Sequence, residues 1–284
     1  MPRSFLFSKQ NVEYITTLTI AGSDCSGGAG IQADIKTMSA LGCYAASVIT
    51  SITVQNTCGV KAIQNVKPEI VEGQIIAVMD DIRPAAIKIG MVNDADTIDI
   101  IADTLKRYET KTLIVDPVMV ASGGQRLMQE DALEIFEKRF MPMATLLTPN
   151  IPEAEILSGI KINTIKDIDR SAKIILSKGC KSVLIKGGHL DGQKTDRLYT
   201  PHTSIEIYFR NIQTHNTHGT GCTLSSAITA YLARGEKMQT AITKAKEYIT
   251  KALEYGAEVK IGNGIGPVNH FFDPQKLIIK KKTI

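Results

Sequence analysis

The stretch YITTLTIAGSDCSGGAGIQADIKTMSALG, residues 14–42, shows the succession of an apolar segment and an amphipathic segment that decides the fold. Its first part, Tyr14–Gly22, is apolar and rich in β-branched residues, which is typical of a buried strand. Its last part, Ala29–Gly42, spaces apolar residues as one face of a helix and ends at a glycine. The stretch therefore predicts a strand, a glycine-rich loop and a helix.

The same alternation of apolar runs and amphipathic segments continues to about Tyr255. We expect further strands at 47–55, 85–90, 112–118, 144–150 and 181–188, and a hairpin formed by 196–200 and 204–210. We expect helices at 68–82, 94–108, 151–159, 165–178, 220–235 and 238–259. Such alternation predicts an α/β fold with a central, mostly parallel β-sheet flanked by helices on both faces.

The chain has no internal repeat or linker, so its 284 residues predict one domain, at 15–273, between an N-terminal extension, 1–14, and a basic tail, 274–284. The net charge of +4 and the lack of a long basic stripe argue against nucleic-acid binding. No apolar run is long enough to span a bilayer or to form a signal sequence. The five cysteines lack metal-ligand spacing, which predicts reduced thiols and a cytoplasmic location.

The loop after the first strand carries a form of the dinucleotide fingerprint, G-x-G-x-x-A, at Gly28, Gly30 and Ala33. In a dinucleotide site the first glycine follows the strand directly, whereas Gly28 comes several residues later. No Asp or Glu lies between Asp34 and Glu69 to bind a ribose. A G-K-[ST] phosphate loop is also absent from the sequence. The loop is therefore not predicted to bind NAD.

Two interpretations of this first loop remain. Its glycines allow the backbone to approach a ligand closely, and the carboxylate of Asp24 favours a small polar molecule that donates hydrogen bonds over a polyphosphate. Alternatively, it is a glycine-rich turn that binds nothing.

A second glycine-rich segment, NTHGTGCTLSSAITAYLA, begins at Asn216. Gly219, Thr220 and Gly221 precede a strong helix pattern, so their amide groups point outward at a helix N-terminus, where negative charge is stabilised. This arrangement is suited to the charge on a phosphoryl group in transfer. Cys222 in the first turn is expected to have its thiol pKa lowered below about 8.5. The alternative is a glycine N-cap followed by a buried cysteine.

Charged side chains follow three other predicted strands. Lys186 ends one strand, where its ammonium group would neutralise phosphate. Asp116 and Glu153 follow two more and are the carboxylates best placed to hold Mg²⁺, with Asn150 close by in the sequence. Each acid alone is also explained as a helix cap or a surface group. Together with the second glycine loop they predict phosphoryl transfer.

These motifs resemble a known family when taken in order. AGSDCSGGAGIQADIKT, VQNTCGV, KIGM, DPVM, TPNIPEAE, KGGH and NTHGTGCTLS are similar to the hydroxymethylpyrimidine/phosphomethylpyrimidine kinases of thiamine biosynthesis, from about Leu18 to Ala230. The resemblance implies a ribokinase-like fold, a homodimer and Mg-ATP as phosphoryl donor. It implies 4-amino-5-hydroxymethyl-2-methylpyrimidine and its monophosphate as substrates.

The resemblance also implies roles for individual residues. The phosphates and the transfer step would involve Lys186, Thr217, Gly219–Gly221 and Asn150, with Cys222 as base in place of the aspartate of many superfamily members. The pyrimidine pocket would be lined by Gly22, Asp24, Ala29, Gln55, Met91 and Val118. Physical chemistry supports two of these assignments, because a carboxamide complements an aminopyrimidine edge and a thioether packs well against a ring.

The segment DPVMVASGGQRLM, residues 116–128, is predicted to form a mobile lid that excludes water during transfer. Related pyridoxal kinases resemble this family, and some carry a lid cysteine where this lid has Ser122. That difference favours the pyrimidine substrate. A pyridoxal or pyridoxine kinase stays the alternative, as does a non-catalytic ligand-binding protein of the same fold, against which the charged residues at the strand ends argue.

Overall fold

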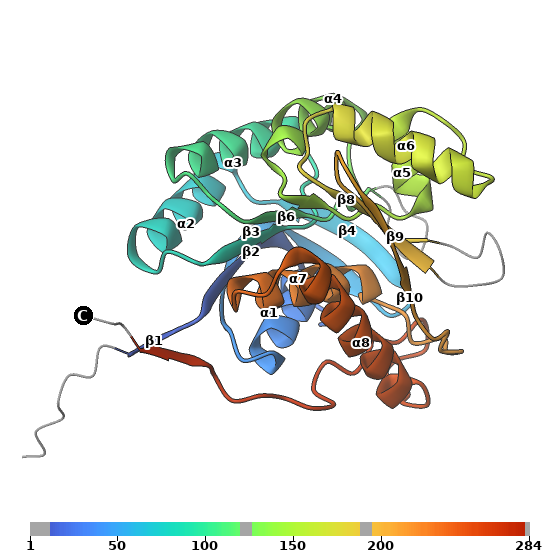
Figure 1. The fold of residues 1–284 in the computed structure, drawn as a ribbon. Helices are drawn as coiled ribbons and strands as arrows, with labels where there is room; N and C mark the ends of the chain where they lie inside the picture. Colours follow the sequence, from blue (N-terminus) through green and yellow to red (C-terminus); the bar gives the residue numbers. More distant parts are fainter. Residues whose placement is uncertain (1–11, 120–126, 188–194, 282–284) are drawn as a thin grey trace, which may run out of the picture.

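The computed structural model describes residues 12–119, 127–187 and 195–281. Within these ranges one large sheet has the strand order β10-β9-β8-β7-β6-β5-β2-β3-β4 (Figure 1). The strands from β3 to β8 in this order run parallel. At the edges β4 pairs antiparallel with β3, and β9 pairs antiparallel with both β8 and β10. The mostly parallel sheet is thus confirmed. Its strands are β2 (Thr16–Asp24), β3 (Tyr44–Asn56), β4 (Gly59–Asn65), β5 (Ala86–Ile89), β6 (Leu113–Val115), β7 (Leu146–Leu147), β8 (Val183–Ile185), β9 (Thr195–Tyr199) and β10 (Ser204–Tyr208).

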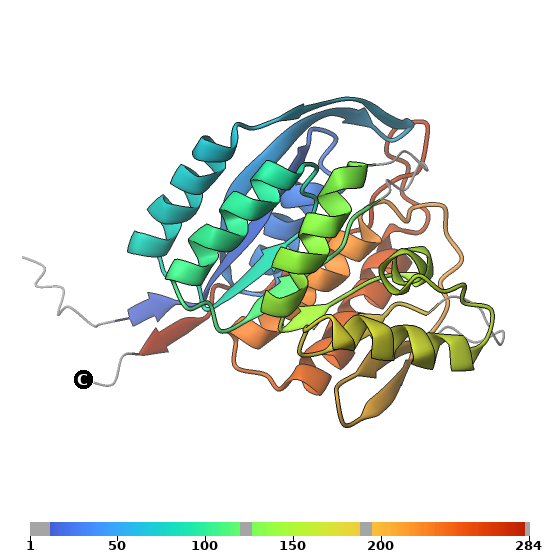
Figure 2. The same cartoon turned by 90° about the horizontal axis from the view of Figure 1, so that it is seen from above.

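Helices cover both faces of the sheet, as expected, and each layer has its own apolar core. One layer is formed by α2 (Pro68–Asp81), α3 (Ala95–Arg107), α4 (Glu130–Arg139), α5 (Ile151–Ser158) and α6 (Ile165–Ser177), and Figure 2 shows α2, α3 and α4 side by side across the sheet. The other layer is formed by α1 (Gly30–Ala40), α7 (Thr220–Ala233) and α8 (Met238–Gly256). Burial on both sides explains why the central strands are continuously apolar.

Some elements differ from the expected ones. The sequence predicted a strand over 144–150, but only Leu146–Leu147 form β7; beyond it Asn150 makes an isolated parallel bridge to Lys186 and is the N-cap of α5. Strand β4, helix α4 and the 3₁₀ turn η1 (Met141–Met143) were not predicted. Strand β4 lies at the sheet edge and has no buried residue, so it lacks the apolar run that marks the central strands. The β9–β10 hairpin is confirmed.

The two ends of the described chain form a separate two-stranded sheet. Strand β1 (Val12–Tyr14), in the predicted extension, pairs antiparallel with β11 (Ile279–Lys281), in the predicted basic tail (Figure 1). The division into one domain with two extensions stays a prediction. None of the helices in the described ranges combines the length and the apolar character needed to cross a bilayer.

Candidate active site

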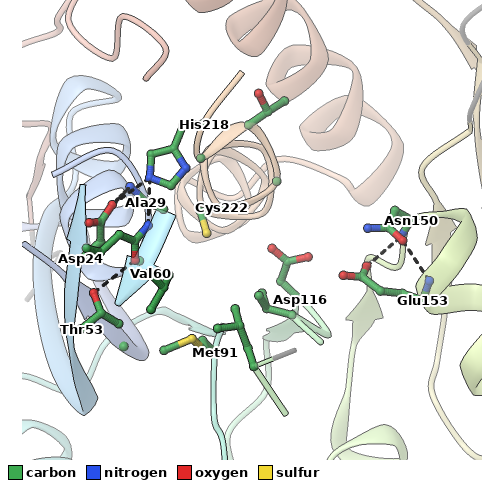
Figure 3. Close-up of a pocket in the computed structure, with 18 of the residues that line it drawn as sticks. Asp24, Ala29, Thr53, Val60, Met91, Asp116, Asn150, Glu153, His218 and Cys222 are labelled. Carbon is green, nitrogen blue, oxygen red and sulfur yellow. Dashed lines mark hydrogen bonds and ion pairs between the residues drawn. The ribbon is translucent and has the colours of Figure 1, made fainter. Parts of the chain in front are cut away.

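A cavity of about 460 Å³ opens at the carboxyl ends of the parallel strands, where ligands bind in open α/β sheets. Figure 3 shows Asp24, Thr53 and His218 on one wall, Asn150 and Glu153 on the opposite wall, and Cys222 and Asp116 between them. Every predicted site residue lines this cavity: Gly22, Asp24, Ala29, Gln55, Met91, Asp116, Val118, Asn150, Glu153, Lys186, Thr217, Gly219, Thr220, Gly221 and Cys222. The structure thus brings them together, while their individual roles stay predictions.

The N-terminus of α7 faces the cavity without a side-chain cap. Gly219, the N-cap, has a φ of 79°, and a Cβ there would lie 1.9 Å from the Gly28 carbonyl oxygen, so only glycine fits. The amide groups of Gly221 and Cys222 have no hydrogen-bond partner within the described residues. Two backbone donors at the positive end of a helix are therefore available to an anion.

A buried ion pair lies beside these amides. Lys186 Nζ is 3.0 Å from Asp116 Oδ1, and Asp116 also accepts hydrogen bonds from Thr148 and Ser225. A Cβ on Gly221 would lie 3.5 Å from Lys186 Nζ, which shows how close the ammonium group is to the helix N-terminus. Burial alone would raise the pKa of Asp116, but the neighbouring ammonium groups of Lys186 and Lys88 hold it below its usual value. Asp116 is thus ionised at neutral pH.

Glu153 and Asn150 form a capping box at the start of α5. The Asn150 side chain accepts from the Glu153 amide at 2.9 Å, and Glu153 accepts from the Asn150 amide at 2.8 Å. Both residues therefore cap a helix, as the alternative interpretation predicted for Glu153, and both also line the cavity. Burial raises the pKa of Glu153 to about 7, against the pull of the Lys186 ammonium group.

The carboxylate oxygens of Asp116 and Glu153 fit a magnesium ion whose remaining ligands are water and substrate phosphates. Mg²⁺ in nucleotide sites takes one or two carboxylates, several waters and the substrate phosphates. Asp116 and Glu153 provide two carboxylates on the same cavity. Within the described ranges no group of three or more His, Cys, Asp or Glu residues is arranged to hold a metal without such help.

The prediction that the pKa of the Cys222 thiol is lowered is wrong, because the structure raises it. Burial raises its pKa to about 11; the Lys88 ammonium group opposes the rise, and the Asp34 and Asp116 carboxylates add to it. The sequence located Cys222 at a helix N-terminus but gave no sign that desolvation and two carboxylates would outweigh that position. The thiol is therefore protonated at neutral pH in the protein without ligands.

A fully buried ion pair below the cavity was missed. Lys88, between the apolar residues of β5, projects to the α1 and α7 side of the sheet, where its Nζ lies 2.7 and 2.8 Å from the two Asp34 oxygens. Asp34 also accepts from Thr19 and Ser226, each at 2.6 Å. A lysine in an otherwise apolar strand was the available signal, but its partner 54 residues away was not apparent.

His218 was also missed, although it lies between the predicted Thr217 and Gly219. Its Nε2 is 2.9 Å from Asp24 Oδ2 (Figure 3). The same nitrogen is 3.3 Å from the side-chain amide of Gln55. Asp24 Oδ1 accepts from the amide and hydroxyl groups of Ser26, and Oδ2 accepts from the amides of Gly28 and Ala29. Burial would raise the pKa of Asp24, but the bonds from His218, Ser26 and Ala29 lower it to about 2.

The remaining wall is close-packed around Met91. A Cβ on Gly22 would lie 2.3 Å from Met91 Cε, so the methionine occupies the space that this glycine leaves. Of the predicted lid, residues 120–126, Ser122 among them, lie outside the described residues, as do Gly188 and His189 of the KGGH motif.

Comparisons with known proteins agree with this geometry. The profile of the family described as phosphomethylpyrimidine kinase matches residues 24–269. A hydroxymethylpyrimidine/phosphomethylpyrimidine kinase of Rhizobium meliloti is 48% identical over 256 residues, 89% of this chain and 96% of the relative. A phosphomethylpyrimidine kinase structure from Clostridium difficile is 49% identical with a TM-score of 0.76, over 84% of this chain and 99% of that one. A Bacillus subtilis pyridoxal kinase solved with ADP is 35% identical with a TM-score of 0.83, over 91% and 98%. The chain therefore belongs to the phosphomethylpyrimidine kinase family.

Proposed function

We propose that this cavity transfers the γ-phosphoryl group of ATP to the hydroxymethyl oxygen of 4-amino-5-hydroxymethyl-2-methylpyrimidine, and in a second round to its monophosphate, for thiamine diphosphate biosynthesis. The relatives named for these two activities support the substrate. Three features meet in one cavity and carry the proposal: α7 N-terminal amides that have no partner among the described residues, the Lys186–Asp116 pair, and a wall that includes Gln55 and Met91.

The ring is proposed to bind where Gln55 and Met91 face the cavity. A carboxamide pairs with the amino group and the adjacent ring nitrogen of an aminopyrimidine, and the thioether packs against the ring. Backbone close to the ring is provided by Gly22 and Ala29, and Val118 adds an apolar contact.

The phosphates are proposed to bind at the N-terminus of α7. The amides of Gly221 and Cys222 stabilise the charge of the migrating group, Lys186 neutralises it further, and Thr217 and Asn150 line the nucleotide side of the cavity. Asp116 and Glu153 would hold Mg²⁺, which supplies positive charge to the phosphates when bound. Because the transition state is loose, position and charge contribute more than a strong base.

Cys222 is proposed to accept the hydroxymethyl proton as the thiolate. Its raised pKa means that the thiolate is a minor form near neutral pH. The Lys88 ammonium group favours the thiolate, because it lowers the thiol pKa.

A coupled assay of ADP release with purified protein, ATP and Mg²⁺ tests this function. We expect turnover with the hydroxymethylpyrimidine, a second equivalent of ADP through the monophosphate, and much lower efficiency with pyridoxal. Absence of pyrimidine-dependent ADP release above the basal rate would overturn the proposal.

Pyridoxal phosphorylation is the second candidate, because solved pyridoxal kinases align over more of this chain than the Clostridium structure does. Their sequence identity of 33–35% is lower. The same assay decides between the two substrates.

We further propose a cytoplasmic homodimer. The cysteines, all free thiols, fit a reducing compartment, and the resemblance implies the dimer. Sedimentation velocity would give the mass of a dimer, and a single monomeric species would contradict it.

A further inference from the structure

The side-chain amide of Gln55 lies between two polar groups that differ in their hydrogen-bonding role. One end of the amide is 3.3 Å from His218 Nε2, and the other end is 3.2 Å from Thr53 Oγ1. The oxygen and nitrogen of an amide differ in hydrogen-bonding role but hardly in shape, so the surrounding network decides which end is which. The assignment matters here because this amide is the group expected to pair with the substrate ring.

The proton on His218 fixes one end of the amide. Asp24, with its lowered pKa, is an ionised acceptor that already receives amide bonds from Gly28 and Ala29. Since a carboxylate offers no proton, the 2.9 Å contact requires that His218 Nε2 carries the hydrogen. A Gln55 NH₂ group facing this nitrogen would oppose two donors, whereas the Gln55 oxygen would accept a shared hydrogen bond.

Thr53 fixes the other end in the same sense. Its hydroxyl lies 3.0 Å from the Ser23 carbonyl oxygen, and that carbonyl can only accept. When the single hydroxyl proton goes to Ser23, the Thr53 oxygen is left as an acceptor for the Gln55 NH₂ group. Both ends of the amide are then paired.

We propose that His218 is a positioning residue for the Gln55 side-chain amide. It holds this amide with the oxygen toward the α7 loop and the nitrogen toward Thr53. The orientation of the amide in turn sets the direction in which the pyrimidine binds. The ring presents its nitrogen, its amino group and its hydroxymethyl group in that order along one edge. Pairing the amino group with the Gln55 oxygen places the hydroxymethyl group beyond the His218 end of the amide. That is the end from which the chain continues into Gly219–Cys222. The reverse orientation would direct the reacting oxygen away from the loop.

The position of His218 is itself constrained by two glycines, Gly266 and Gly28. Its amide bonds to Gly266 at 3.0 Å, and a Cβ on Gly28 would lie 2.3 Å from the imidazole ring. Only a glycine at position 28 leaves room for the ring beside Asp24.

This inference rests on the proposed function, and a substrate analogue separates the two. In the 4-oxo analogue, a carbonyl replaces the amino group and the adjacent ring nitrogen carries hydrogen. With its hydroxymethyl group toward the α7 loop, the edge of this ring pairs only with a reversed Gln55 amide. We expect the wild-type protein to prefer the amino ring in kcat/KM on the order of 10- to 100-fold. His218→Leu removes the donor at the oxygen end and leaves only Thr53 to orient the amide, so this preference should fall about tenfold with the ATP KM unchanged.

Three variants complete the test. His218→Gln restores an N–H donor of similar reach and should recover the preference, whereas His218→Asn is too short and should behave like His218→Leu. His202→Leu, in the exposed turn of the β9–β10 hairpin, is the matched control and should leave the preference unchanged. Thermal melts confirm folding, which we expect because Asp24 keeps four other hydrogen bonds. If His218→Leu does not fold, His218→Asn decides.

The outcomes are distinct. A wild-type preference that survives in His218→Leu or His218→Asn would overturn the role of His218 and leave the kinase assignment intact. Equal wild-type efficiency on the two rings would also overturn it. No phosphorylation of either ring would overturn the proposed function and this inference with it.

Discussion

The two glycine-rich loops of this protein look alike in sequence but differ in the hydrogen-bond acceptors of their backbone amide groups. In the first, Ser23–Gly30, the amides of Ser26, Gly28 and Ala29 all point at the carboxylate of Asp24. In the second, the amides of Gly221 and Cys222 are left without a partner within the described residues. The first loop thus contains its own anion, and the second is open to an external one.

This difference explains why the fingerprint-like glycines do not make a dinucleotide site. Asp24 occupies the position that a phosphate would need and repels one by charge. The glycines of the first loop instead permit close packing, since Gly28 contacts both Gly219 and the ring of His218. Glycine content alone therefore does not predict phosphate binding; the partners of the amides do.

The largest effect is expected at the open loop. Lys186→Met removes the cation beside the free amides and leaves Asp116 buried without its ion pair. We expect kcat to fall on the order of 10²–10³-fold, as when a charge-stabilising group is removed. Steady-state kinetics of ADP release measure this. Lys181→Met, in an exposed position nearby, is the control, and equal activity of the two variants would contradict the account.

A smaller effect is expected from Cys222→Ala, which should lower kcat about 10²-fold if the thiolate accepts the proton. Because the thiol pKa is about 11, the thiolate fraction and hence the wild-type kcat should rise as pH increases from 7 to 10. Cys222→Asp carries a base already ionised in this range, so its kcat should be flat. Parallel pH profiles of the wild type and Cys222→Asp would show that Cys222 is not the base.

The closed loop should affect stability more than chemistry. Asp24→Asn puts an NH₂ group against the donors that now meet a carboxylate, and we expect a loss of about 1–3 kcal/mol in the free energy of unfolding. Urea unfolding at pH 7 measures the loss. Asp81→Asn, at an exposed site, serves as the control. A loss no larger than that of the control would mean that Asp24 does not hold the loop.

The smallest effect concerns Glu153, whose pKa rises from 4.5 to about 7 on folding. Between these values the folded protein binds a proton that the unfolded chain does not, so this residue's contribution to stability is lost as pH rises through 7. Glu153→Gln keeps an acceptor for the capping box and removes the titration. Urea unfolding at pH 5 and pH 8 should show a smaller decrease for the variant than for the wild type; equal decreases would refute this.

The sequence predicted the alternation of strands and helices along the chain, because each strand buried on both faces leaves an apolar run. It predicted which residues line the cavity, because polar residues that follow such strands meet at one edge of the sheet. It did not reveal the Asp34–Lys88 pair or the position of His218, because both depend on which distant segments come into contact. The prediction of a lowered Cys222 thiol pKa was wrong for the same reason, since burial and neighbouring carboxylates are features of the tertiary structure.

The most direct test of the difference between the two loops is a crystal structure with a non-hydrolysable ATP analogue, Mg²⁺ and the hydroxymethylpyrimidine. The account predicts the terminal phosphate within hydrogen-bond distance of the Gly221 and Cys222 amides and of Lys186 Nζ. A triphosphate bound against Gly27–Gly30, with the α7 amides empty, would contradict it.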